Sequence, residues 1–271
     1  MISVAISLAV ALLLMVAAPR ILSHGTWAVH RPALALAMWF AAFFTACALF
    51  ISAIATLVWL GIDRTTMTSN TEAPVFTIAS WGTLGLVGGL IALVAQANEP
   101  LQQARDHERR QLAAAALDVE PRDGFTLVKV ASDEAFACAV PGQRAQIMYS
   151  TALDELLTPP QLQAVIAHEY AHLRSFHPQL MRIATIAAKM LPRWVPAGRE
   201  FRRATGLLIE LMADDTAGKQ AGAANLANAL VQMSKATSDR SSEARAMRLT
   251  LREWPVGRRR RLPEQIRLHQ L

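Results

Sequence analysis

The stretch of sequence that decides the fold is TPPQLQAVIAHEYAHLR, residues 158–174. Thr158 suits a helix N-cap, a proline occupies the first helical position after it, and apolar residues then recur at helical spacing. These features predict a helix that contains the motif His168-Glu169-Tyr170-Ala171-His172, an HExxH pattern. Residues four apart share a helix face and lie about 5 to 6 Å apart, so both imidazoles can reach one tetrahedral ion. We therefore predict that His168 and His172 bind zinc.

The glutamate inside this motif has a chemical role of its own. Glu169 is expected beside the metal, where its carboxylate can accept a proton from a water molecule whose pKa the zinc lowers to about 7. It can later pass that proton to the leaving amine. The competing interpretation is a chance match, expected in about 1% of chains of this length, with histidines that are only packed or solvated. The first interpretation predicts metal-assisted hydrolysis with Glu169 as the catalytic base.

A second acidic segment, ELMADD at residues 210–215, lies in a helical pattern that runs over 202–217. Glu210 is the favoured third ligand of the single zinc ion expected per chain. Asp214 follows one turn later on the same face, where it can accept a hydrogen bond from a ligand histidine and fix its tautomer. His177 and Glu200 are the competing third ligands. Pro178 indicates that His177 lies past the end of the motif helix and faces elsewhere.

The N-terminal part of the chain is apolar. Of the 271 residues 53% are hydrophobic and 18% charged, and three uncharged apolar runs occur at about 2–18, 33–60 and 74–97. Each run is near or above the roughly 17 to 25 residues that span a bilayer. The first run lacks a Lys or Arg before its apolar core, which argues against a cleaved signal peptide. We predict a transmembrane helix bundle over 1–97 and a soluble domain over 98–271.

Loop charges predict the orientation of these spans. Arg20 and Arg31 lie in the first loop, Arg64 is alone in the second, and three arginines follow the third span at 105, 109 and 110. By the positive-inside rule the N-terminus is outside and the C-terminal domain is cytoplasmic, in a multi-pass protein of the cell membrane. Packing inside the chain or an oligomer contact would explain the GxxxG pair Gly85 and Gly89.

The chain is basic, with a formal net charge of +6. It lacks aromatic-interleaved basic stretches and a recognisable reading helix, so no direct nucleic-acid partner is expected. Attraction to anionic lipid and an ordinary solvated surface both explain the charge, including the four-arginine run at 258–261. The two cysteines, Cys47 and Cys138, indicate neither a disulfide framework nor a cysteine zinc site.

The soluble part combines helices with a small sheet. Asn98-Glu99-Pro100 is expected to end the third span, and a helix is expected over 101–117. Short strands are expected at 125–130, 135–140 and 146–150, with a turn at Pro141-Gly142, and another helix at 222–237. Residues 180–195 predict a helix against the membrane or core rather than a fourth span. The predicted fold class is mainly α with a small β-sheet.

One of these strands is a candidate for substrate contact. A peptide can bind as an added strand along Ala137, Cys138 and Ala139, its backbone paired and its scissile carbonyl directed to the zinc. An ordinary core strand explains the same alternation of residues. No single residue can be chosen from the sequence as the stabiliser of the oxyanion.

With these motifs the sequence resembles the membrane-bound gluzincin metallopeptidases of the BlaR and MecR antirepressor type. The resemblance rests on Ala18-Pro19-Arg20 after the first span, on ACAVPG at 137–142, and on the segment from Glu210 to Asp214. The related HtpX and CAAX-prenyl peptidases share HExxH and a similar Glu-x-x-Ala-Asp pattern. The resemblance implies zinc bound by His168, His172 and Glu210, with Glu169 as catalytic base.

The resemblance also implies a protein substrate, a winged-helix transcriptional repressor cleaved in regulatory signalling. The penicillin-binding sensor domain of the best known members has no counterpart up to Leu271, so sensing of β-lactams is not implied. Two alternatives remain open: a quality-control protease of the HtpX type, and a non-catalytic membrane scaffold that holds zinc structurally. The scaffold would need a fourth protein ligand, for which the sequence offers no spare cysteine.

Overall fold

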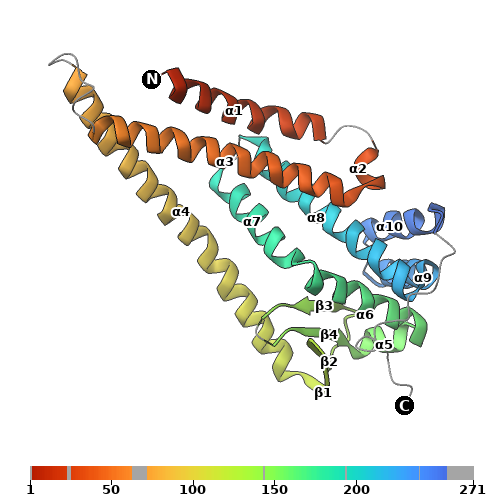
Figure 1. The fold of residues 1–271 in the computed structure, drawn as a ribbon. Helices are drawn as coiled ribbons and strands as arrows, with labels where there is room; N and C mark the ends of the chain where they lie inside the picture. Colours follow the sequence, from red (N-terminus) through yellow and green to blue (C-terminus); the bar gives the residue numbers. More distant parts are fainter. Residues whose placement is uncertain are drawn as a thin grey trace. The chain divides into compact units, whose positions relative to one another are not determined.

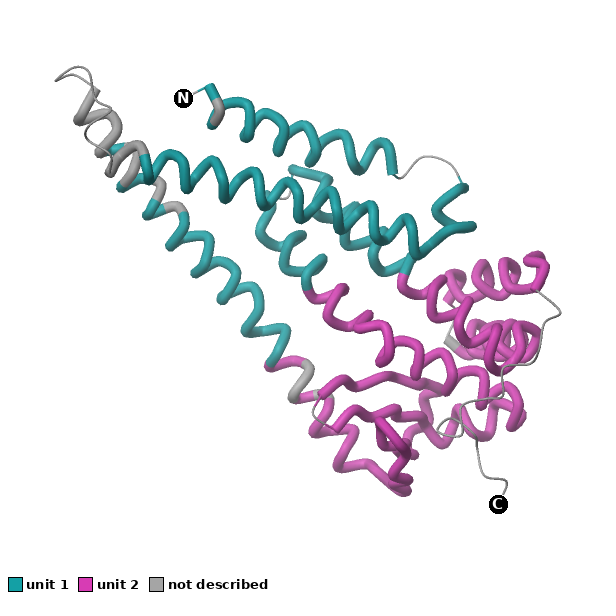
Figure 2. The backbone as a smooth tube through the Cα atoms, in the orientation of Figure 1, with its two compact units in different colours: residues 1–102, 183–208 teal, residues 103–182, 209–271 magenta. Residues whose placement is uncertain are grey.

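The computed structural model describes residues 2–22, 26–62, 72–142, 144–192, 194–237 and 239–254. They form two compact units, the first made of residues 1–102 and 183–208 and the second of 103–182 and 209–271 (Figure 2). The chain therefore returns to the first unit after the predicted boundary at residues 97 and 98. Three helices pass from one unit to the other: α4 (Glu72–Ala114), α7 (His177–Met190) and α8 (Pro196–Ala217).

The first unit contains the apolar helices. Helix α1 (Ile2–Leu22) packs along α3 (Pro32–Ile62), with the short α2 (Trp27–His30) between them in sequence (Figure 1). The segments Val4–Leu22 and Pro32–Trp59 are long and apolar enough to cross a membrane, and only 17% and 22% of them is buried. The core helix of a soluble protein would bury most of such a segment, so these exposed apolar surfaces fit contact with lipid.

The third expected span, 74–97, lies in α4, where many side chains fall outside the described residues, so this span stays a prediction. No described atom lies within 4 Å of a Cβ placed on Gly85 or Gly89. Packing inside the described chain therefore does not explain that glycine pair.

Helix α4 corrects one expectation about the chain. It continues through Asn98-Glu99-Pro100, where we expected the span to end, and stops at Ala114 rather than Leu117. An internal proline costs a helix about 3 kcal/mol. Strong helix formers on both sides, ALVAQ before and LQQAR after, offset that cost.

Residues 183–208 belong to the first unit through close packing. Phe201 of α8 lies with its ring centroid 5.0 Å from that of Phe40 and 5.1 Å from that of Phe43 on α3. A Cβ on Gly198 would lie 2.9 Å from the Cα of Ala188, so the close approach of the first turn of α8 to α7 requires glycine there. The apolar stretch 180–195 is thus mostly helix, and it ends at Met190.

The second unit is built on a four-stranded sheet of order β1-β2-β4-β3. Its strands are β1 (Ala116–Arg122), β2 (Phe125–Val130), β3 (Ala137–Val140) and β4 (Gln146–Ser150). Strands β1 and β2 form a hairpin through Asp123-Gly124, where Gly124 has a φ of 86°. Strand β4 pairs parallel with β2 and antiparallel with β3. Three strands occur where expected, although β3 begins at Ala137, two residues late.

Helices cover this sheet and complete the core. They are α5 (Thr151–Leu156), α6 (Pro159–Arg174), α9 (Ala223–Thr237) and α10 (Arg240–Leu251), with a π-helical turn at Gly218–Gly222. Helix α6 lies against β3 and β4 and also contacts α9 (Figure 1). It begins as predicted, because the Gln161 side chain accepts a hydrogen bond from the Thr158 N–H at 3.0 Å. The most buried core side chains include Ile147, Leu153, Ile166, Leu226 and Leu249.

Candidate metal centre

Three donor atoms converge between α6 and α8 in the second unit. Nε2 of His168 lies 3.0 Å from Nε2 of His172 and 3.3 Å from Oε2 of Glu210, and Nε2 of His172 lies 3.5 Å from Oε1 of Glu210. Ligands about 2.0 to 2.1 Å from a tetrahedral zinc ion are separated by about 3.4 Å. The spacing and the His, His, Glu donor chemistry therefore fit one zinc ion, and the three residues could hold a metal.

The group is closed on one side and open on the other. His168 and His172 are buried one turn apart on α6, whereas the Glu210 side chain is 35% exposed. The other expected candidates, His177 and Glu200, are not part of the donor group found among the described residues. An open side leaves room for a solvent or substrate ligand, as catalytic zinc sites require.

Asp214 lies behind the first histidine. Its Oδ1 is 3.0 Å from Nδ1 of His168, and its side chain is fully buried. The two groups form an ion pair when His168 is protonated, and the Asp214 carboxylate raises the pKa of His168. This placement matches the position expected for a carboxylate that orients a metal-binding histidine.

The pKa values of the three donor residues are shifted in different directions. Burial lowers the pKa of His168, but hydrogen bonds to Asp214 and Glu210 outweigh it and raise that pKa to about 9. Burial and then the charge of His168 lower the pKa of His172 to about 3. Burial raises the pKa of Glu210, yet the hydrogen bond and charge of His168, with Arg245, lower it to about 2. In the metal-free group His168 is thus protonated on both ring nitrogens and positively charged, His172 is neutral, and the neighbouring carboxylates are ionised.

Glu169 lies beside this group and next to the sheet edge. Its carboxylate is half-buried and accepts a hydrogen bond from the backbone N–H of Ala139 on β3. Burial raises its pKa to about 7, against the charge of His168. A carboxylate with a pKa near neutrality is suited to exchange protons at physiological pH.

The predicted substrate strand is at the edge of the sheet. Backbone pairing of Ser150 with Phe136 continues by alternation to Cys138 with Met148, so the N–H and C=O of Ala137 and Ala139 point away from β4. Cys138 instead packs its side chain on the cluster that contains Met148. Of the three residues named from the sequence, Ala137 therefore offers its backbone N–H and C=O to a partner, and Ala139 offers its C=O, because its N–H donates to Glu169.

An arginine that the sequence analysis did not identify joins the site. Arg245 of α10 donates hydrogen bonds to both Asp214 oxygens at 2.8 and 2.6 Å, and its Nη1 lies 2.8 Å from Oε2 of Glu210. Two more arginines of α10 and its C-terminal end, Arg248 and Arg252, pair with Asp215 at 2.8 and 2.6 Å. The acidic face of α8 is thus matched by arginines spaced three and four residues apart.

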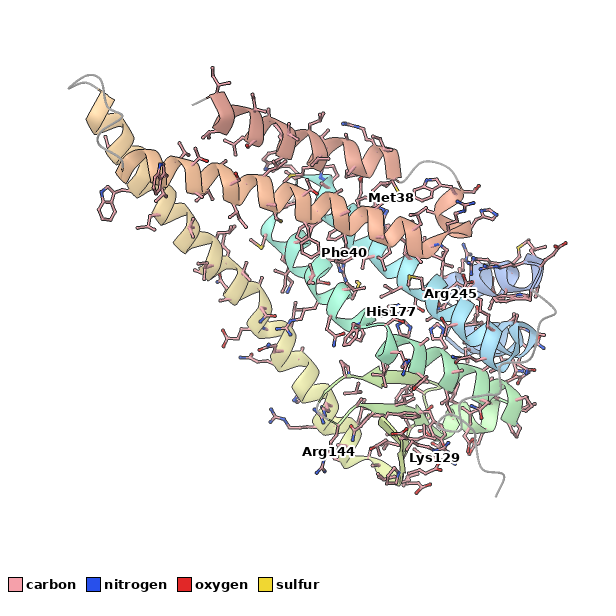
Figure 3. The ribbon with its side chains drawn as sticks, viewed as in Figure 1. Met38, Phe40, Lys129, Arg144, His177 and Arg245 are labelled. Carbon is pink, nitrogen blue, oxygen red and sulfur yellow. The ribbon has the colours of Figure 1, made fainter. Side chains whose placement is uncertain are left out.

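His177 lies behind the second histidine. Nδ1 of His177 is 3.1 Å from Nδ1 of His172, and the two rings meet edge to face. Burial lowers the pKa of His177 to about 4, so its ring is neutral at physiological pH. The view in Figure 3 labels His177 at the start of α7 and Arg245 on α10.

The sequence of this chain matches the model of a known protein family. The model of peptidase family M48 matches residues 100–253, more than half of the chain, and this range contains the whole donor group. The chain belongs to peptidase family M48 and is a membrane-associated metallopeptidase. A search of curated proteins and a search of solved structures find no match to this chain.

Proposed function

We propose that this protein is a zinc-dependent endopeptidase anchored in the membrane by its apolar N-terminal helices. The observation that supports this most directly is the convergence of His168, His172 and Glu210, whose donor atoms lie 3.0 to 3.5 Å apart. Zinc bound there would supply Lewis-acid polarisation of the scissile carbonyl and of a water molecule. The arrangement agrees with the family and with the exposed face of Glu210.

Three residues around the donor group have separate roles in the proposed reaction. Glu169 takes a proton from the attacking water and returns it to the leaving amine, a role that a pKa of about 7 suits. Asp214 would keep the hydrogen of His168 on Nδ1, which would leave Nε2 to bind zinc. Arg245 pairs with both Glu210 and Asp214 and offsets part of their negative charge.

We propose that the peptide substrate adds a strand to the free edge of β3. The backbone groups of Ala137 and Ala139 point to that edge, and Ala139 also contacts Glu169. Peptide substrates with single backbone N-methyl groups test this without altering the enzyme. We expect the rate of cleavage to decrease only when the N-methyl group is at every second residue of the peptide, because an added strand turns every second N–H toward its neighbour. An even loss at all positions would contradict strand addition.

The central experiment measures zinc stoichiometry and proteolysis on detergent-purified protein. We expect about one zinc per chain in the wild type, none in His168→Ala or Glu210→Ala, and full zinc without cleavage in Glu169→Gln. Glu200→Ala is the matched control, since Glu200 lies on the same helix as Glu210 and is one of the two competing third ligands, with His177. A wild type without zinc overturns the proposal. If Glu200→Ala loses zinc and Glu210→Ala keeps it, Glu200 is the third ligand in place of Glu210.

The physiological substrate is a finer proposal. Following the resemblance to antirepressor peptidases, we propose a cytoplasmic winged-helix repressor as the substrate, cleaved by a domain on the cytoplasmic face. Incubation of the purified enzyme with a purified winged-helix repressor from the same organism tests this by the appearance of discrete fragments that Glu169→Gln does not produce. Preferential cleavage of misfolded membrane proteins instead would favour the quality-control role.

A further inference from the structure

We propose that His177 is a positioning residue that fixes the tautomer and orientation of the metal ligand His172. This inference rests on the proposed zinc site. His177 is 1% exposed, and its only ring hydrogen-bond contact among the described residues joins its Nδ1 to Nδ1 of His172 at 3.1 Å. It was a candidate third ligand, but it lies on the opposite side of the His172 ring from His168 and Glu210.

The chemistry of the imidazole assigns the direction of this contact. Nε2 of His172 faces Nε2 of His168 and Oε1 of Glu210, so this nitrogen is the one available to a metal. A neutral imidazole that binds metal through Nε2 bears its hydrogen on Nδ1. Nδ1 of His172 therefore donates and Nδ1 of His177 accepts. His177 then has its own hydrogen on Nε2.

The backbone before His177 supports a functional placement. Phe176 has a φ of 54°, in the left-handed region that costs a non-glycine residue about 1 to 2 kcal/mol. Its side chain is exposed, so burial of the phenyl ring does not compensate for that cost. The turn ends α6 at Arg174 and begins α7 at His177, which returns the chain beneath His172. Backbone strain of this kind is concentrated at functional sites.

A purely structural role explains the ring less well. A histidine kept only for packing would be matched by an apolar residue of similar size, without a buried polar nitrogen to satisfy. Nε2 of His177 is buried without a hydrogen-bond partner among the described residues, and such a group costs about 1 to 3 kcal/mol. The contact with His172 is the interaction that an apolar side chain cannot replace.

The two ligand histidines are thus oriented by different partners. Asp214, an ionised carboxylate, lies behind His168, whereas a neutral ring lies behind His172. The second orienting contact adds no negative charge to a site that already contains Glu210 and Asp214. The positive charge of a zinc ion bound there would then be less compensated, which would favour polarisation of a substrate carbonyl.

The test compares zinc affinity, by competition with a chromophoric chelator, in wild type, His177→Asn and His177→Leu. Asn and Leu are nearly equal in shape, but only Asn places an acceptor near the position of Nδ1. We expect His177→Leu to weaken zinc binding about 10- to 100-fold and His177→Asn to restore most of it. In the cobalt-substituted protein, the visible absorption spectrum of His177→Leu should differ more from that of the wild type than the spectrum of His177→Asn does.

Equal zinc affinity in wild type and His177→Leu would overturn the inference. If the Leu variant does not fold, His177→Gln takes its place, because the Gln amide reaches the position of Nε2 instead. Equal affinities of the Asn and Gln variants would then overturn it. Failure of the wild type to bind zinc would overturn the proposed function itself, and this outcome is distinct from both.

Discussion

Arg245 donates two hydrogen bonds from one guanidinium to the carboxylate of Asp214, Nε to Oδ2 at 2.8 Å and Nη2 to Oδ1 at 2.6 Å. The same group contacts Oε2 of Glu210 through Nη1 at 2.8 Å. One side chain of α10 therefore pairs with both the carboxylate behind His168 and the carboxylate proposed to bind the metal. Asp214 has no exposure to solvent, so it depends on this partner.

Replacement of Arg245 is expected to destabilise the second unit. Arg245→Leu leaves the buried Asp214 carboxylate without the guanidinium and with His168 as its remaining charged partner among the described residues, and the loss of one partner of a buried ion pair costs about 3 to 5 kcal/mol. Arg245→Lys keeps the charge but not the two parallel hydrogen bonds, so an intermediate loss is expected. Denaturant unfolding in detergent measures both.

Arg240→Leu provides the control for these variants. Arg240 lies on the same helix but is exposed, and a surface substitution there should change the free energy of unfolding by about 0.5 kcal/mol or less. Equal effects of the Arg240 and Arg245 substitutions would show that the ion pairs with Asp214 and Glu210 contribute nothing to stability.

The donor group was predictable because local helical spacing determines it. His168 and His172 are four residues apart, and Glu210 and Asp214 are four apart, so each pair shares one face of its own helix. A helical sequence pattern is enough to place each pair on one face. The only further condition was that these two faces, of α6 and α8, pack against each other.

Arg245 was not predictable in this way, since 31 residues separate it from Asp214 and no local periodicity connects them. Helix α10 itself is weakly apolar, and only Ala246 and Leu249 of it are buried. Strand β1 was missed for a related reason. It contains Pro121 and exposes Leu117 and Val119, so its pattern lacks an alternating buried face, which an edge strand does not need.

Zinc binding is expected to release a proton from His168. The pKa of this group is raised to about 9 in the metal-free protein, so His168 is protonated at neutral pH and the metal must displace that proton. Apparent zinc affinity should therefore rise with pH, by about tenfold per unit below pH 9. His172 adds nothing to this slope because its pKa is lowered to about 3.

Calorimetry in two buffers of different ionisation enthalpy counts the released protons. The Glu169→Gln background at pH 6 is suitable, because it removes a second group that titrates near neutrality. We expect about one proton per zinc. Zinc binding without proton release would show that His168 is already neutral in the metal-free protein.

Substitution of Phe176 by glycine is expected to stabilise the protein. Glycine relieves the left-handed conformation, worth about 1 to 2 kcal/mol, and gives back about 0.4 to 1 kcal/mol through the greater freedom of the unfolded chain. The net gain should be on the order of 0.5 to 1 kcal/mol in denaturant unfolding. Phe176→Ala is the control, since it removes the exposed ring but keeps the Cβ. A gain as large with alanine would trace the effect to the ring instead.

A side chain at Gly218 is expected to destabilise the protein, because Trp254 lies directly over this position. A Cβ at this position would be 2.9 Å from Cη2 and 3.2 Å from Cζ2 of the indole. The ring cannot move aside freely, since its Nε1 donates to the carbonyl of Leu249 at 2.8 Å and the guanidinium of Arg252 lies over its face. Gly218→Ala should therefore lower the free energy of unfolding by about 1 to 3 kcal/mol.

In a Trp254→Leu background the same substitution should cost clearly less, as a double-mutant cycle would show. Gly142→Ala, whose nearest neighbour would be Nη1 of Arg109 at 3.5 Å, is the control for adding a methyl group without a clash. If Gly218→Ala costs no more than Gly142→Ala, the indole does not hold the end of α10 against the π-helical turn.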